Sequence, residues 1–363
     1  MTIPIARPII SEEEIAKVRE VMESGMLASG KQVKEFEAEF AAYCGSPHGI
    51  ATSSGTTALH AALLALEIGP GDKVLTTPFT FAASGNSIIF VGAEPVFSDI
   101  DPETYNLDPD KAEEVLRQDP DIKAIMVVHL FGLACDMEAY QGLADKYDVY
   151  LIEDAAQSHG AKYQGQKVGT FGDAACFSFY PTKNMTTAEG GMILTPHDDV
   201  SEKARLLVNH GQTQRYEHSS LGYNFRLTNL AAAIGLVQLP KLNEWNRKRR
   251  ENAAYFNGQF QGLAPVKTPV EPEGYEHVYH QYTLRVPDRG DLVRALTENG
   301  IGYGIHYPIP LHHQPYYREL GYGDLELPVA EDVARKVISL PVHPSLSDEE
   351  LKKVVQVIVA HYS

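Results

Sequence analysis

Residues 149–159 read VYLIEDAAQSH, an apolar run that ends in two carboxylates and a polar turn. Comparable runs rich in Val and Ile stand at residues 73–77, 95–99 and 124–129. Short apolar strands separated by helices are typical of βαβ units, in which helices cover both faces of a mainly parallel sheet. The sequence therefore predicts an α/β fold, with the intervening helices near residues 56–67, 80–90, 109–117 and 136–147.

The remaining pattern predicts a second, smaller domain. A turn-rich stretch at residues 262–275 indicates a boundary region. We therefore expect a large α/β domain over residues 1–240 and a small C-terminal α+β domain over residues 241–363. The other elements expected after residue 173 are strands at 174–179, 191–195 and 278–286, and helices at 227–239, 242–260, 291–299, 329–340 and 348–361.

The composition narrows the class of protein. A chain of 363 residues with 44% hydrophobic and 22% charged residues is long enough for two domains and has an ordinary globular balance. The formal net charge of −17 disfavours nucleic acid as a partner, because it repels a phosphate backbone. Three scattered cysteines suggest neither disulfides nor zinc, and no apolar run is long enough to cross a membrane. We expect a cytoplasmic protein without a membrane partner.

In an open parallel sheet, ligands bind beyond the carboxyl ends of the strands, and three motifs are expected there. The first is SSGTTAL at residues 53–59, which leads directly into a helix. Backbone N–H groups at a helix N-terminus, next to hydroxyls and a Gly, suit a phosphate dianion. A simple helix cap explains the same residues, so this motif alone decides little.

The second motif is the carboxylate Asp154, at the end of the strand within residues 149–159. A buried carboxylate needs a cationic partner, because its unpaired desolvation is costly. A protonated pyridine nitrogen would be such a partner and would remain electron-withdrawing. A neighbouring Lys or Arg, or a metal ion, is the alternative partner at this stage.

The third motif is FSFYPTKNMTTAEGG at residues 177–191, where Lys183 stands in a loop between two apolar strands. A partly desolvated lysine amine can form a Schiff base with a carbonyl group. An isolated lysine is usually a surface charge. The three motifs together supply a phosphate cradle, a pyridinium partner and a carbonyl-capturing amine, which one cofactor, pyridoxal 5′-phosphate, requires at once.

These residues resemble the DegT/DnrJ/EryC1/StrS family of pyridoxal-phosphate-dependent sugar aminotransferases, which have fold type I. The resemblance covers nearly the whole chain. It rests on SGTTAL at 54–59, TF at 80–81, EDAAQ at 153–157, SFYPTK at 178–183, EGG at 189–191, GYNFRLT at 222–228, and HYP at 306–308 followed by LH at 311–312.

The resemblance implies roles for particular residues. Lys183 would hold the cofactor as a Schiff base, and Asp154 would pair with its ring nitrogen. The remaining expected cofactor contacts are Thr56, Thr57 and Ser178 to the phosphate, Phe81 to the ring face, Gln157 to the ring oxygen, and Asn224 to the cofactor phosphate of the other subunit of a homodimer. Weaker candidates on the substrate side are His159, Arg226, His306 and Tyr307.

The implied reaction moves an amino group from an amino acid, usually glutamate, to a nucleotide-linked keto-sugar. The acceptor ketone would be at sugar position 3 or 4, and the TTAEGG loop at residues 186–191 looks closer to members that act on 4-keto sugars. Ala188 in this loop stands where many relatives have Gly. The nucleotide is not indicated by any residue.

Four other functions are disfavoured by the sequence. A dehydratase of the same family would carry His in place of Lys183, and a regulatory protein that retains the fold would not need a Schiff-base lysine. A nicotinamide oxidoreductase is disfavoured because no GxGxxG opens a helix after the first strand. A metal site built from His306, His312 and His313 is disfavoured because prolines interrupt the segment, so no metal is expected.

Overall fold

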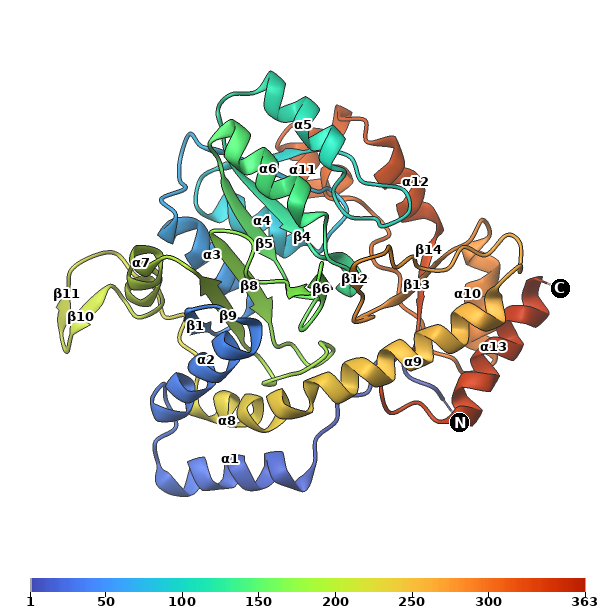
Figure 1. The fold of residues 1–363 in the computed structure, drawn as a ribbon, viewed down its shortest axis with the longest axis horizontal. Helices are drawn as coiled ribbons and strands as arrows, with labels where there is room; N and C mark the ends of the chain where they lie inside the picture. Colours follow the sequence, from blue (N-terminus) through green and yellow to red (C-terminus); the bar gives the residue numbers. More distant parts are fainter. Residues whose placement is uncertain (1, 363) are drawn as a thin grey trace.

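The computed structural model describes residues 2–362 and has a seven-stranded central sheet (Figure 1). Five of its strands, in the order β8-β5-β4-β2-β3, pair in parallel, whereas β9 is antiparallel to both of its neighbours, β8 and β1. The predicted α/β class with a mainly parallel sheet is therefore confirmed. In sheet order, the strands are β1 His48–Thr52, β9 Gly191–Thr195, β8 Ala174–Ser178, β5 Tyr150–Asp154, β4 Ile122–Val128, β2 Lys73–Thr76 and β3 Glu94–Phe97.

Helices cover both faces of this sheet because its strands are apolar on both sides. Successive strand residues point to opposite faces, so Leu151 packs in one hydrophobic cluster and Ile152 in the other. One face is covered by α2 Lys31–Cys44, α5 Pro109–Gln118, α6 Met137–Tyr147 and α8 Asn229–Gln238. The opposite face is covered by α3 Gly55–Ala65, α4 Ala82–Phe90 and α7 Asp198–Val208, and α1 Glu12–Ser24 packs outside α8.

The C-terminal part forms a separate layer around an antiparallel pair, β13 Tyr282–Arg285 and β14 Val337–Leu340. The long helix α9 Leu242–Phe260 runs from the large domain to this part (Figure 1). There it packs with α13 Asp348–Tyr362, which also contacts α10 Arg289–Glu298.

The expected helix at residues 329–340 is wrong in its last four residues. Helix α12, Pro328–Lys336, ends at Lys336. The next four residues, VISL, form β14 instead. All four side chains of β14 are buried, and pairing with β13 supplies their backbone hydrogen bonds. Tertiary pairing therefore overrides the helical periodicity of the preceding residues.

The boundary at residue 240 stays a prediction, but hydrophobic packing crosses it in both directions. Ile3 is buried among side chains of the C-terminal part and forms a bridge with Ile301. In the other direction, Leu311 and Tyr317 belong to one hydrophobic cluster with Phe79 and Phe97, which precede residue 240. The segment that contains them includes η3 Leu311–His313, α11 Pro315–Glu319 and η4 Tyr322–Asp324.

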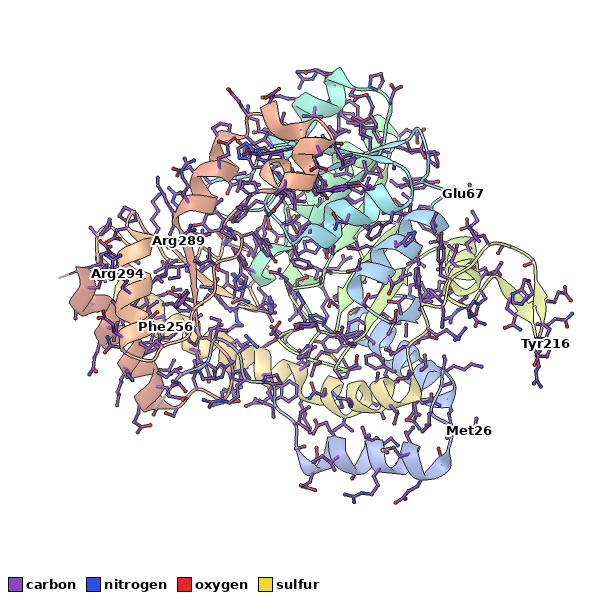
Figure 2. All side chains as sticks on the ribbon, turned by 180° about the vertical axis from the view of Figure 1, so that it is seen from behind. Met26, Glu67, Tyr216, Phe256, Arg289 and Arg294 are labelled. Atoms are coloured by element: carbon purple, nitrogen blue, oxygen red, sulfur yellow. The ribbon has the colours of Figure 1, made fainter. Side chains whose placement is uncertain are left out.

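A short hairpin of β10 Gln212–Gln214 and β11 Glu217–His218 projects from the large domain (Figures 1 and 2). Its tip residue Tyr216 is 79% exposed. The remaining short elements are η1 Leu130–Gly132, η2 Leu239–Lys241, and a small sheet of β6 Lys162–Tyr163, β7 Gln166–Lys167 and β12 Tyr275–Glu276. Within residues 2–362, no helix has the length and apolar character that a membrane crossing requires.

Candidate active site

A cavity of about 480 Å³ opens beyond the carboxyl ends of the central strands, where α/β folds bind ligands. It draws residues from both parts of the chain, since the C-terminal part supplies His280, Gln281, His306 and Tyr307. The predicted site residues that line this cavity are Thr56, Phe81, Asp154, Gln157, Ser178, Lys183, His306 and Tyr307.

The wall formed by the start of α3 has the features of an anion cradle. Gly55 and Thr56 line the cavity as the first two residues of the helix, where backbone N–H groups have no intrahelical acceptor. Ser54 is the N-cap, and Ser178 contributes a hydroxyl from the end of β8. A Cβ on Gly55 would lie 2.7 Å from the Cβ of Ser178, so only Gly permits this close approach.

Thr57, a predicted phosphate contact, is not among the residues that line the cavity. Its hydroxyl accepts a hydrogen bond from the backbone N–H of Ser54 at 3.0 Å, while the Ser54 hydroxyl accepts from the N–H of Thr57 at 3.1 Å. These reciprocal bonds form a capping box. The Thr57 side chain therefore acts in the helix cap together with Ser54, while Ser54, Gly55 and Thr56 line the cavity.

Asp154 is a buried carboxylate at the cavity wall, with an exposed fraction of 5%. Its Oδ2 accepts a hydrogen bond from the Ser84 hydroxyl at 2.7 Å, and its Oδ1 accepts from the backbone N–H of Ala156 at 3.2 Å. Burial raises the pKa of Asp154, although these bonds and the nearby charge of Lys183 oppose the shift. A cationic ligand group beside this carboxylate would favour its ionised form.

Lys183 lines the same cavity from the loop between β8 and β9 and is half-buried. Burial lowers the pKa of the Lys183 ammonium to about 8, even though the charge of Asp154 acts in the opposite direction. A much larger fraction of this lysine is therefore the neutral amine near pH 7 to 8 than of an ordinary lysine. This amine is suited to attack a carbonyl carbon.

A hydrogen bond between Gln157 and Tyr307 connects the turn after β5 to the C-terminal part of the chain at the cavity. The Gln157 Oε1 accepts a hydrogen bond from the backbone N–H of Phe131 at 2.8 Å, and its Nε2 donates to the Tyr307 hydroxyl at 3.0 Å. Phe81, 59% exposed, lies at the cavity with its ring centroid 6.1 Å from that of Tyr307. An aromatic ring that binds there would have Phe81 available for stacking.

His306 is held by the C-terminal part of the chain. Its Nδ1 lies 3.1 Å from the hydroxyl of Ser339 in β14. Burial, with a smaller effect of the Lys183 charge, lowers the pKa of His306 to about 4. The imidazole is therefore neutral at pH 7 and adds no positive charge to the cavity.

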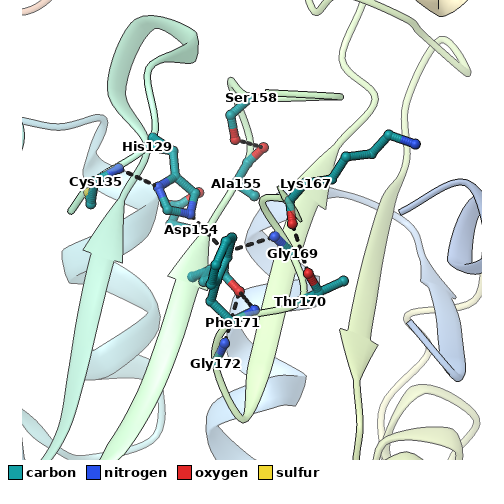
Figure 3. Close-up of polar contacts among 12 residues, drawn as sticks. His129, Cys135, Asp154, Ala155, Ser158, Lys167, Gly169, Thr170, Phe171 and Gly172 are labelled. Atoms are coloured by element: carbon teal, nitrogen blue, oxygen red, sulfur yellow. Dashed lines mark hydrogen bonds and ion pairs between the residues drawn. The ribbon is translucent and has the colours of Figure 1, made fainter. Parts of the chain in front are cut away.

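The neighbour of Asp154 on β5, Glu153, anchors the strand from the opposite face. Figure 3 labels its partners His129, Gly169, Phe171 and Gly172. Its carboxylate accepts hydrogen bonds from the N–H groups of Gly169, Phe171 and Gly172 at 2.7, 2.8 and 3.0 Å. The Nε2 of His129 lies 2.9 Å from the same carboxylate, in a pair with no exposed surface. Burial raises the pKa of Glu153, but His129 and these N–H groups outweigh it, so the net shift is downward.

Besides Thr57, three further predicted residues lie outside the cavity lining. His159 is fully buried, with its ring between Phe177 and Phe179, which does not support a substrate contact. Arg226 donates a hydrogen bond to the Asn209 Oδ1 at 2.8 Å, as in the structural alternative to a donor-binding arginine. Asn224 is exposed on the segment after the β10–β11 hairpin.

The histidines of the rejected metal alternative are divided between two places. His306 lines the cavity, whereas His312 and His313 lie near Glu331, with Nε2 to Oε1 distances of 3.5 and 3.9 Å. His312, His313 and Glu331 form a group whose possible ligand atoms lie within 4.8 Å of one another. They are not among the residues that line the cavity.

Sequence reasoning missed several residues that the fold brings to the cavity. Ser54 and Tyr180 belong to motifs already recognised, so their neighbours gave a usable signal. His280 and Gln281 come from the C-terminal part and carry no local motif. Their position depends on how that part packs against the large domain.

Comparisons with known proteins place the chain in a family. A family model described as the DegT/DnrJ/EryC1/StrS aminotransferase family matches residues 8–359. A pleiotropic regulatory protein of Geobacillus stearothermophilus is 45% identical over 346 residues, which are 94% of this chain and 92% of that protein. The UDP-N-acetyl-3-dehydro-alpha-D-glucosamine 3-aminotransferase of Acidithiobacillus ferrooxidans is 40% identical over 350 residues, covering 96% and 94% of the two chains.

Solved structures give the same result for the fold. The crystal structure of S. venezuelae DesV in complex with a ketimine intermediate matches with a TM-score of 0.93 at 37% identity, covering 96% of this chain and 94% of that one. The expected fold of pyridoxal-phosphate-dependent transferases is thereby confirmed. By the extent of the family match and the similarity to these relatives, the chain belongs to the DegT/DnrJ/EryC1/StrS aminotransferase family.

Proposed function

We propose that this aminotransferase uses pyridoxal 5′-phosphate and transfers an amino group from an amino acid, with glutamate as the expected donor, to a nucleotide-linked keto-sugar. The observation that carries the proposal is that one cavity is lined by Lys183, Asp154 and the start of α3. A carbonyl-capturing amine, a buried acid and an anion cradle meet there, as this cofactor requires. Bound at this place, the cofactor would withdraw electrons from the substrate carbon and make its proton removable.

The residues of the chain have separable tasks in this proposal. Gly55, Thr56 and Ser178 would hold the phosphate, Asp154 would pair with the ring nitrogen, and Phe81 would pack on the ring. The Lys183 amine, once displaced by the amino donor, would carry a proton to and from the substrate carbon. Its lowered pKa suits this exchange, because both protonation states are populated near pH 8.

The sugar acceptor is supported by the relatives and by the room in the cavity. The 3-aminotransferase relative is named for a UDP-linked 3-dehydro sugar, and the cavity of about 480 Å³ is also lined by Gln281 of the C-terminal part. A ketone at position 3 or 4 is therefore proposed. The loop at residues 186–191 favoured position 4, whereas the name of this relative favours position 3, so both positions belong in the test.

A homodimer with shared sites is part of the proposal. Asn224 is exposed and outside the cavity of its own chain, yet it was expected at a cofactor phosphate. A second subunit that packs over the start of α3 would bring its Asn224 to that phosphate. The exposed side chains Leu221 and Tyr216, at 76% and 79%, would be covered in the same interface.

The two alternatives are disfavoured by the site. A dehydratase of the family would have His at position 183, where this chain has Lys. The relative that is named as a regulatory protein makes a regulatory role worth testing. A protein without catalysis would have no use for an amine with a lowered pKa in a cavity beside a buried acid.

The test is a transfer assay with purified protein. Glutamate and a panel of nucleotide-linked 3-keto and 4-keto sugars are supplied, and the amino-sugar product is sought by mass spectrometry. We expect product from at least one sugar, and none with Lys183→Ala. If free keto acids are aminated while no sugar of the panel is, the sugar proposal is wrong. If the protein does not bind added pyridoxal phosphate, the whole proposal is wrong.

A further inference from the structure

The hydroxyls of Ser84 and Thr80 are buried next to Asp154 and have no task in the proposed reaction. Ser84 is 1% exposed and lies in the first turn of α4, and Thr80, 3% exposed, lies just before that helix. The Ser84 Oγ is 2.7 Å from the Asp154 Oδ2, and the Thr80 Oγ1 is 3.0 Å from the Ser84 Oγ. These three groups form a continuous line that ends at the carboxylate.

The direction of both hydrogen bonds follows from the chemistry of the end group. An ionised carboxylate only accepts hydrogen bonds, so the single hydroxyl proton of Ser84 must point to Asp154. Ser84 then has only lone pairs to offer to Thr80, so the Thr80 hydroxyl must donate. Thr80 polarises Ser84 in this arrangement, and the bond to the carboxylate is strengthened.

Ser84 contacts Asp154 by a direct side-chain hydrogen bond, unlike the titratable groups near this carboxylate. The titratable groups that face this carboxylate are Lys183, His129 at the end of β4, Cys176 in β8 and Tyr307 of the C-terminal part. Within residues 2–362, however, Ser84 is the one side chain that hydrogen-bonds the Asp154 carboxylate. Its position on α4 places it in the same helical turn as the ring-packing candidate Phe81, the N-cap of that helix.

We propose that Ser84, oriented by Thr80, is a positioning residue that fixes the Asp154 carboxylate at the cavity wall and holds it ionised for a cationic ring nitrogen. The inference rests on the proposed function, because it needs a ligand with such a nitrogen. Without Ser84, the buried Oδ2 loses its hydrogen bond, and protonation of Asp154 becomes the way to relieve the desolvation. A protonated Asp154 pairs less strongly with a pyridinium.

The chain offers a matched set of variants. Ser84→Ala removes the donor to Asp154, Ser84→Thr keeps the hydroxyl, and Thr80→Val removes only the second hydrogen bond. Ser87→Ala is the control: Ser87 is equally buried on α4, but its hydroxyl bonds the backbone carbonyl of Ser84 at 2.9 Å instead of Asp154. Thermal unfolding of each apoprotein shows whether the variant is folded.

The primary measurement is the affinity of each apoprotein for pyridoxal phosphate, followed by fluorescence from pH 6 to 9. We expect Ser84→Ala to weaken binding about tenfold to a hundredfold, because a hydrogen bond to a charged group is lost. Thr80→Val should weaken it less, and Ser84→Thr and Ser87→Ala should remain within about threefold of the wild type. The visible spectrum of the bound cofactor should change with pH in Ser84→Ala and not in Ser87→Ala.

The outcomes separate the two proposals. If the wild type binds pyridoxal phosphate and Ser84→Ala binds it equally well, with an unchanged spectrum, the role of Ser84 is wrong and the proposed function stands. If the wild type does not bind pyridoxal phosphate, both proposals fall. Should Ser84→Ala not fold, Thr80→Val decides alone: wild-type affinity in that folded variant overturns the role of the two hydroxyls.

Discussion

The amide of Gln157 donates a hydrogen bond to the Tyr307 hydroxyl at 3.0 Å, which ties the turn after β5 to the C-terminal part of the chain at the cavity. The other end of the amide is fixed by the N–H of Phe131. The orientation of Gln157 is therefore set from the large domain, and Tyr307 takes its position from Gln157. Burial raises the pKa of Tyr307, so its hydroxyl remains protonated throughout the physiological range.

Tyr307→Phe should remove this connection and little else. We expect a loss of about 1 kcal/mol in the free energy of unfolding, measured by urea denaturation, because one buried hydrogen bond is lost. Tyr303→Phe is the control, since the Tyr303 hydroxyl has no hydrogen bond within residues 2–362. Equal effects of the two substitutions would contradict the importance of the Gln157 bond.

The Lys183 amine should capture carbonyl groups in a pH-dependent way. The reactive form is the neutral amine, so the rate of imine formation between apoprotein and a small aromatic aldehyde should rise with pH and level off above about 8. Because the charge of Asp154 raises the pKa of Lys183, Asp154→Asn should move the midpoint to lower pH. A midpoint near that of an ordinary lysine would show that Lys183 is not desolvated.

Glu153→Gln should destabilise the fold much more than a surface substitution. The amide of Gln brings N–H groups toward the N–H groups of Gly169, Phe171 and Gly172, and the buried His129 loses its ionised partner. We expect a loss of about 3 kcal/mol or more, from urea denaturation monitored by circular dichroism.

The pH dependence of this contribution has a definite sign. The pKa of Glu153 is lowered in the folded protein, so its contribution to stability is present above the pKa of an unfolded Glu. It is lost as the pH falls through the lower folded value. The difference between wild type and Glu153→Gln should therefore shrink in acid; a difference that stays constant to low pH would argue against an ionised Glu153.

Ala188→Gly should stabilise the protein. Ala188 has φ of 70°, in the left-handed region that costs a residue with a Cβ about 1 kcal/mol relative to Gly. The free energy of unfolding should rise by about 1 kcal/mol or slightly less. Ala38→Gly, at an exposed site within α2, is the matched control and should lower stability by about 0.5 to 1 kcal/mol. A loss of stability at both positions would contradict the prediction.

Shared active sites predict complementation between two defective subunits. Lys183→Ala and Asn224→Ala should each lower transfer activity when they are alone. In a heterodimer of the two, one site carries both substitutions and the other carries neither, so a random mixture regains roughly a quarter of the wild-type sites. The measurement is activity after co-expression with two affinity tags. Activity no greater than the average of the two separate variants would show that Asn224 acts in its own subunit or not at all.

The sequence by itself determined the fold class and the chemistry of the central residues. Val- and Ile-rich runs separated by helices predicted the parallel sheet, and the strand ends placed Asp154 and the SSGTTAL motif on one edge. These features are local in the chain: periodicity, end signals and motif spacing can be read without long-range contacts. The loop motif between two strands marked Lys183 in the same way, and the family resemblance added Gln157.

Tertiary structure alone decided which of the marked side chains face the cavity. Thr56 and Thr57 are neighbours in one motif, yet only Thr56 lines the cavity, because the Thr57 side chain is held in the capping box. His159 follows the strand end, but its buried ring packs against Phe177. The four-residue strand β14 and the line from Thr80 through Ser84 to Asp154 join segments far apart in the chain. Contacts of this kind depend on how distant segments pack, which the periodicity of either segment does not encode.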